Sequence, residues 1–130
     1  MKAMMNDASL MILRVSFGLM MMIGHGLPKL QMAIAGGDIQ FPDPIGLGAA
    51  FSLYAAVFSE FVCALFVIIG FKTRIFAGFL VFTMIVAAFI VHASDPFFMK
   101  KEFPLMYAFA FLSLMGTGAG KYSVDGKMGH

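Results

Sequence analysis

The sequence predicts an all-α fold, a transmembrane four-helix bundle with antiparallel, up-down topology. Hydrophobic residues make up 61% of the 130 residues, charged residues make up only 12%, and the mean hydropathy is +0.91. Soluble domains are about half apolar and about a quarter charged, so this composition indicates an integral membrane protein. A helix needs roughly 20 residues to cross a hydrocarbon core, and four apolar segments come close to that length: 9–27, 47–69, 75–92 and 103–119. We therefore expect a single membrane domain over residues 1–130.

The first segment carries ionisable side chains on one face. Arg14, Gly18, Met22 and His25 are separated by 4, 4 and 3 residues, a spacing that places them on one face of a helix. Charged side chains are expensive inside a bilayer, so this face is predicted to have a function or to hold an ion pair. A cleavable signal peptide with Lys2 in its basic region is the alternative. Arg14 argues against it, because it lies where the apolar core of such a peptide would be.

The second segment carries one carboxylate in a row of small side chains. Ser52, Ala56, Glu60 and Ala64 recur every four residues, and such a stripe lets helices pack closely in a membrane. Glu60 is therefore expected to face the interior. Counted from the inner helix ends, Arg14 and Glu60 lie at depths of roughly 9 and 15 Å. An arginine side chain spans that difference, so we predict a structural ion pair between Arg14 and Glu60.

The third and fourth segments bring polar side chains to the outer level of the bundle. His92 ends the third segment and Glu102 begins the fourth. His25 and His92 each lie about 18 residues from the inner ends of their helices, hence near one level. The spacing on the fourth segment predicts one face made of Glu102, Met106, Ala110, Ser113 and Thr117. The sequence therefore predicts an outer pocket lined by His25, Lys29, His92 and Glu102.

The same residues also have a purely structural interpretation. Lys29 and Glu102 are long enough to reach the membrane interface without taking part in chemistry, and His25 and His92 lie where helix ends meet lipid headgroups. Two histidines on different helices, without a ligand-spacing motif, are weak evidence for a metal, and we predict no metal site.

The connecting segments differ in length and composition. Residues 36–44 are rich in Gly, Pro and Asp, so we expect an irregular loop that folds back over the outer mouth of the bundle. The turn at 70–74 is short, which makes the second and third helices neighbours. The Gly- and Lys-rich tail, Gly116 to His130, is expected to fray.

The basic residues at the segment ends predict the orientation. In a four-span bundle both termini and the turn at 70–74 share one side. That side carries Lys2, Lys72, Arg74, Lys121 and Lys127, and the other side carries Lys29, Lys100 and Lys101. By the positive-inside rule we expect both termini in the cytoplasm.

Several chemistries are excluded by what the sequence lacks. Cys63 is the only cysteine, so neither an internal disulfide nor a C-x-x-C redox pair is possible. There is no haem, flavin or iron–sulfur signature, and a net charge of +2 without a basic block gives no reason to expect nucleic acid. Electron transfer would therefore need a bound cofactor or a partner.

The order of these residues resembles the DoxX family of small four-helix membrane proteins, also described as DoxX/DoxD-like. The resemblance extends over nearly the whole chain. It rests on Arg14, Gly18, His25-Gly26 and Lys29-Leu30, on Glu60, on the 70–74 turn (G-x-x-T-R), on His92 and Glu102, and on 118–125 (G-x-G-x-x-S-x-D).

The resemblance implies a bacterial or archaeal cytoplasmic (inner) membrane and a link to quinone chemistry. The family name comes from a small subunit associated with a terminal quinol oxidase, and relatives resemble parts of thiosulfate:quinone oxidoreductases. The leading hypothesis is an oxidoreductase subunit that binds a quinone or quinol headgroup. In this interpretation His25 and His92 contact the headgroup, Lys29 lines the pocket, and Glu102 relays protons. The electron source would be a partner subunit or a soluble electron donor.

Two alternatives belong to other classes. The chain could be a non-catalytic membrane scaffold that recruits redox or stress-defence enzymes, with its polar residues serving helix packing. A small-solute or lipid carrier is less favoured, because no pair of broken-helix repeats is visible. Whether the chain is catalytic by itself and whether it forms a homo-oligomer are left open, although the small-residue faces suit dimerisation among the membrane lipids.

Overall fold

The structure is a computed structural model that describes residues 1–129. Over this range it contains helices and loops and no strand, which confirms the all-α prediction. Three helices are long and apolar enough to cross a membrane, and a fourth long helix of 16 residues, α6, follows them.

The first long helix runs from Lys2 to Ala35. It consists of α1 (Lys2–Met21), the π-helical turn η1 (Met22–Gly26) and α2 (Leu27–Ala35). Pro28 lies in the first turn of α2. A proline inside a helix lacks an N–H group and collides with the carbonyl group four residues before it, and the wider π-helical turn directly before Pro28 accommodates this. The helix therefore continues past the predicted segment 9–27.

The second long helix runs from Ala49 to Ile69. It consists of α3 (Ala49–Val57), the π-helical turn η2 (Phe58–Cys63) and α4 (Ala64–Ile69), and it corresponds to the predicted segment 47–69. The stripe of small side chains is buried as expected, with Ser52, Ala56, Glu60 and Ala64 each at most 9% exposed.

The last two long helices form a close pair. α5 (Thr73–Val86) continues into the π-helical turn η3 (Ala87–Val91), which together correspond to the predicted segment 75–92. After a loop, η4 (Phe97–Lys101) leads into α6 (Glu102–Thr117), which corresponds to 103–119. A short helix, α7 (Val124–Lys127), ends the described chain.

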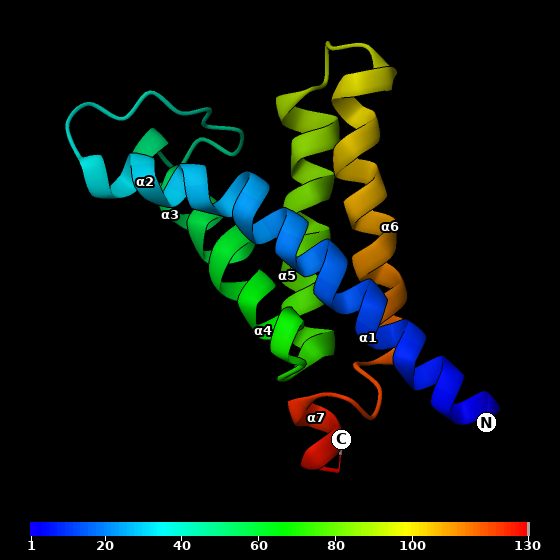
Figure 1. Cartoon of the computed structure of the whole chain (residues 1–130). Helices are drawn as coiled ribbons and strands as arrows, with labels where there is room; N and C mark the ends of the chain where they lie inside the picture. The colour runs from blue at the N-terminus through cyan, green and yellow to red at the C-terminus, as the bar shows by residue number, and fades with distance from the viewer. Residues whose placement is uncertain (130) are drawn as a thin grey trace.

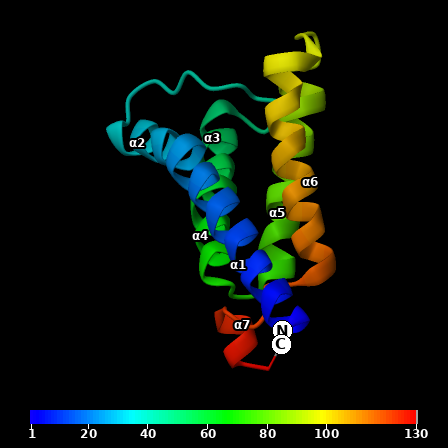
Figure 2. The same ribbon diagram turned by 45° about the vertical axis from the view of Figure 1, so that its right-hand side comes forward.

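The helices diverge toward one end of the molecule (Figure 1). We call this end, with the loops 36–48 and 92–96, the loop end; the opposite tail end holds the turn 70–72 and the C-terminal segment 118–128. α5 and α6 lie side by side, and α1 packs on α4 and α6. Toward the loop end α2 packs on α3, and both lean away from α5 and α6 (Figure 2).

The buried core lies where the helices converge. It is built from all four long helices and mixes small side chains with large ones, which permits a close approach of the backbones. Its buried members are Met21, Cys63, Ala64, Val67, Ala77, Leu80, Met84, Ala108, Phe111 and Leu114.

The C-terminal segment is ordered where the sequence predicted fraying. Asp125 is 7% exposed, and its carboxylate accepts hydrogen bonds from the backbone N–H groups of Lys72 (2.7 Å) and Thr73 (2.9 Å) at the start of α5. The Asp125 N–H group in turn donates to the Gly70 carbonyl oxygen (2.8 Å). The prediction missed this because the partners of Asp125 are backbone groups 52 and 53 residues away. His130, also part of the predicted tail, lies outside the described residues.

The π-helical turns η1 and η2 pack against each other at Gly26. Gly26 lies so close to η2 that a Cβ atom would collide with the backbone carbonyl group of Glu60. Because backbone atoms cannot rotate away as a side chain can, we expect Gly26→Ala to lower the free energy of unfolding by at least about 2 kcal/mol. Unfolding in mixed detergent micelles measures this change. Gly24→Ala is the matched control, since nothing lies within 4 Å of its added Cβ; equal losses in the two variants would contradict the close crossing.

Candidate functional site

A cavity of about 540 Å³ lies at the loop end, where the two pairs of helices diverge. Its walls are mainly apolar and include Phe51, Phe82 and Phe103. The 36–48 loop contributes Phe41, Pro42, Pro44 and Ile45, which confirms the prediction that this loop folds back over the mouth. Polar side chains interrupt the apolar wall: His25, Lys29, Ser52, Glu60, Thr83, His92, Lys100 and Tyr107.

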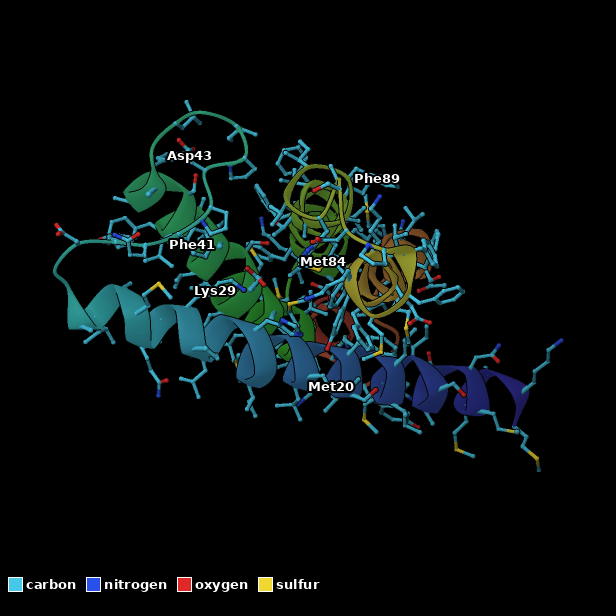
Figure 3. The ribbon with its side chains drawn as sticks, turned by 90° about the horizontal axis from the view of Figure 1, so that it is seen from above. Met20, Lys29, Phe41, Asp43, Met84 and Phe89 are labelled. Atoms are coloured by element: carbon cyan, nitrogen blue, oxygen red, sulfur yellow. The ribbon has the colours of Figure 1, made fainter. Side chains whose placement is uncertain are left out.

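The view from the loop end shows how these elements surround the cavity (Figure 3). Lys29 and Phe41 lie on the sides of α2 and the loop that face α3, whereas Met20 and Phe89 lie on the outer sides of their helices. Asp43 fixes the loop, because its carboxylate accepts hydrogen bonds from Gly48 N–H (3.0 Å) and from the Ser52 hydroxyl group (3.1 Å).

The most buried charges in the cavity wall are an ion pair between Lys29 and Glu60. Lys29 Nζ lies 2.9 Å from Glu60 Oε1, and the two side chains are 23% and 5% exposed. A carboxylate this deeply placed in an apolar wall requires a partner, and Lys29 supplies it. Lys29 Nζ also lies 3.4 Å from the backbone oxygen of His25.

The predicted ion pair between Arg14 and Glu60 is wrong. Arg14 is buried at the tail end, where it donates to the backbone oxygens of Ile68 (3.1 Å) and Tyr122 (2.7 Å). Helical side chains lean toward the N-terminus of their own helix. The first and second long helices start at opposite ends of the molecule, so Arg14 and Glu60 lean apart, while Lys29 leans toward Glu60. Counting depth along the axes ignored this direction.

Three π-helical turns within the first three long helices border the cavity, and η4 before α6 also contributes Met99 and Lys100. Periodicity alone does not reveal these turns. His25 lies in η1, Glu60 lies in η2, and η3 contributes Ala87 and Val91. A π-helical turn holds one residue more than an α-turn, so it shifts the direction of the side chains that follow, and such turns are frequent at functional sites.

His25 lines the cavity in contact with Tyr107 on α6. The two rings meet edge to face with centroids 5.4 Å apart. This contact joins the first long helix to α6 beside the cavity. The sequence did not single out Tyr107, because the predicted face of α6 was wrong: Met106 is 50% exposed, and the buried positions are Ala108, Phe111 and Leu114. The spacing of Tyr107, Phe111 and Leu114 by four and three residues was the signal for the correct face.

His92 also lines the cavity, and it has a partner that the sequence did not identify. His92 Nδ1 lies 2.8 Å from Asp95 Oδ2 in the turn that follows η3. Glu102, in contrast, is not among the residues that line the cavity, whereas Phe103, Pro104 and Tyr107 are. At 100° per residue Glu102 lies about 140° around the helix from Tyr107. The prediction that Glu102 lines the pocket is therefore wrong. The deeper Glu60 is the carboxylate of the cavity.

The model of the DoxX family matches residues 9–93 of this chain. This range covers well over half of the sequence and includes every cavity residue of the first three long helices, while α6 and the tail lie beyond it. Searches of the curated proteins and of the solved structures found no match.

Proposed function

This chain belongs to the DoxX family of membrane proteins, and we propose that it is a quinone- or quinol-binding subunit of a membrane oxidoreductase system. The observation that carries the proposal is the cavity, in which apolar walls surround a buried Lys29–Glu60 ion pair and two histidines. Small-molecule sites are typically of this volume, mostly apolar, with a few polar groups that orient the ligand. A packed interior at this place would have favoured the scaffold interpretation instead.

The chemistry of the wall suits a quinone headgroup. A quinone offers two carbonyl oxygens, and Lys29 Nζ and the His25 ring are potential donors to them. Reduction to the quinol requires one proton for each electron, and the carboxyl group of Glu60 and the imidazole rings of the histidines are groups that can donate and accept protons. The aromatic side chains of the loop-end wall would hold the isoprenoid tail. The electrons would come from a partner subunit or a soluble donor at the loop end.

The proposal includes a membrane arrangement. In it the four long helices cross a bacterial or archaeal inner membrane in alternating directions, with both termini cytoplasmic. The tail end carries the exposed basic residues Lys2, Lys72, Arg74, Lys121 and Lys127, in keeping with the positive-inside rule. The cavity then lies toward the outer leaflet, open to a lipid-soluble ligand.

The test is direct measurement of quinone in the purified protein. We expect a near-stoichiometric quinone in its lipid extract, and we expect His25→Ala and His92→Ala each to weaken binding of a short-chain quinol about tenfold, the loss of one hydrogen bond to the ligand. Titration calorimetry in detergent measures the affinity. Ser113→Ala is the control, because Ser113 is exposed on α6 and its hydroxyl group donates to the Phe109 carbonyl oxygen of its own helix. Failure to extract quinone, together with no binding of added quinol, would overturn the proposal and leave the scaffold.

A further inference from the structure

The turn after η3 holds a histidine–carboxylate pair at the boundary between cavity and solution. The Asp95 N–H group donates to the His92 carbonyl oxygen (3.1 Å), which closes the turn. The turn brings Asp95 Oδ2 to 2.8 Å from His92 Nδ1. The His92 and Asp95 side chains are 31% and 41% exposed, and His92 lines the cavity whereas Asp95 is not among its lining residues.

This contact determines which ring nitrogen carries the proton. A carboxylate only accepts hydrogen bonds, so His92 Nδ1 must carry a hydrogen atom toward Asp95. In the neutral ring Nε2 then has a free lone pair, and it is the nitrogen left for a ligand in the cavity. His92 therefore offers the cavity an acceptor, whereas Lys29, deeper in the wall, is a donor.

We infer that the His92–Asp95 pair makes the cavity prefer the reduced ligand, the hydroquinone, over the quinone. This inference rests on the proposed function. A hydroquinone has hydroxyl groups that donate to Nε2. A quinone has only acceptor oxygens, and their lone pairs would repel the lone pair of Nε2. Asp95 is the positioning residue, and His92 is the group that touches the ligand.

The same geometry gives the hydroquinone proton a route to solution. The O–H bond of the hydroquinone breaks as the Nε2–H bond of His92 forms. This step leaves a hydroquinone anion and an imidazolium ring, and no electron is transferred. The Nδ1 proton passes to the Asp95 carboxylate and from there to water. One lysine contacts this turn and another lies at the cavity: Lys101 Nζ donates to the Ala93 carbonyl oxygen (3.0 Å), and Lys100 lines the cavity mouth. The charge of Lys100 at the cavity would stabilise the hydroquinone anion.

The experiment compares the affinities of one short-chain hydroquinone and of its quinone under anaerobic conditions, for the intact chain in lipid nanodiscs. We expect the wild type to bind the hydroquinone more tightly. Asp95→Ala is expected to weaken hydroquinone binding about tenfold and quinone binding less than about twofold, because only the hydroxyl group uses Nε2 as an acceptor. Asp95→Asn keeps the turn, but its amide group can donate to Nδ1 and so no longer requires a hydrogen atom there; it should therefore behave like Asp95→Ala. Asp95→Glu keeps a carboxylate and should keep the preference for the hydroquinone.

Two further measurements separate this role from a structural one. Asp38→Asn removes an exposed carboxylate of the other loop and should leave the hydroquinone-to-quinone affinity ratio unchanged. Nitrogen-15 NMR of the histidines should show Nδ1–H at His92 in the wild type and its loss in Asp95→Ala. An unchanged ratio in Asp95→Ala, or equal losses for both ligand forms, would overturn this inference and leave the proposed function intact. A wild type that binds neither form would overturn both.

Discussion

Replacing Lys29 by methionine is expected to lower the free energy of unfolding by about 3–5 kcal/mol, the usual cost of breaking a buried ion pair. The reason is the position of Glu60, whose side chain is 5% exposed and whose Oε1 atom would lose its contact with Lys29 Nζ. A charged carboxylate left in an apolar wall must either stay unpaired or take up a proton, and both are unfavourable to the fold. Reversible unfolding in mixed detergent micelles measures the loss.

The double variant Lys29→Met/Glu60→Met separates stability from function. With both charges removed no unpaired group remains, and apolar side chains of similar size often replace a buried pair without loss, so most of the stability should return. Binding of quinone should not return, because the proposed donor is gone. Lys100→Met is the control, since Lys100 is exposed at the cavity mouth, and it should change stability by less than about 0.5 kcal/mol. A single Lys29→Met variant as stable as the wild type would show that Glu60 does not depend on this pair.

Apolar length and residue spacing along the sequence predicted the features of the fold that depend on composition and on which face of a helix a residue occupies. The four long helices, the buried stripe with Glu60, the loop over the cavity mouth and the presence of His25, Lys29 and His92 at one cavity all follow from apolar length, four-residue spacing and level. These properties need no knowledge of how the helices tilt.

The wrong predictions concern contacts that depend on where a side chain points, which is set by its lean along the helix and by the rotation of the helix about its axis. The choice of Lys29 over Arg14 as the partner of Glu60 depends on the lean of side chains toward opposite ends, and the absence of Glu102 from the cavity depends on the rotation of α6. The π-helical turns at His25 and Glu60 change the direction of the side chains that follow them on the first two long helices, and no periodicity predicts these turns. The contacts of Asp95 and Asp125 were not predicted, because Asp95 meets His92 through a turn and Asp125 binds backbone groups far away in the sequence.

Replacing Arg14 by methionine is expected to destabilise the fold at the end opposite to the cavity, by about 3–5 kcal/mol. Arg14 is 1% exposed, and its two terminal nitrogens join three parts of the chain: α1, the Ile68 carbonyl group near the end of α4, and the Tyr122 carbonyl group in the C-terminal segment. Hydrogen bonds from a charged donor contribute about 1.5–3 kcal/mol each, and the buried Asp125 nearby would lose a favourable electrostatic interaction.

Arg14→Lys tests whether the forked shape of the guanidinium group is needed. An ammonium group keeps the charge, but as a compact point charge it cannot present two donors in a fixed fork, so we expect about half of the loss. Arg74→Met is the control at the same end, because Arg74 is exposed and its hydrogen bond to the Thr117 carbonyl oxygen is long at 3.5 Å. The folded fraction of Arg14→Met should still bind quinone with wild-type affinity, since the cavity is lined by other residues. Loss of binding at unchanged stability would contradict this division and would make Arg14 part of the site rather than the support of the fold.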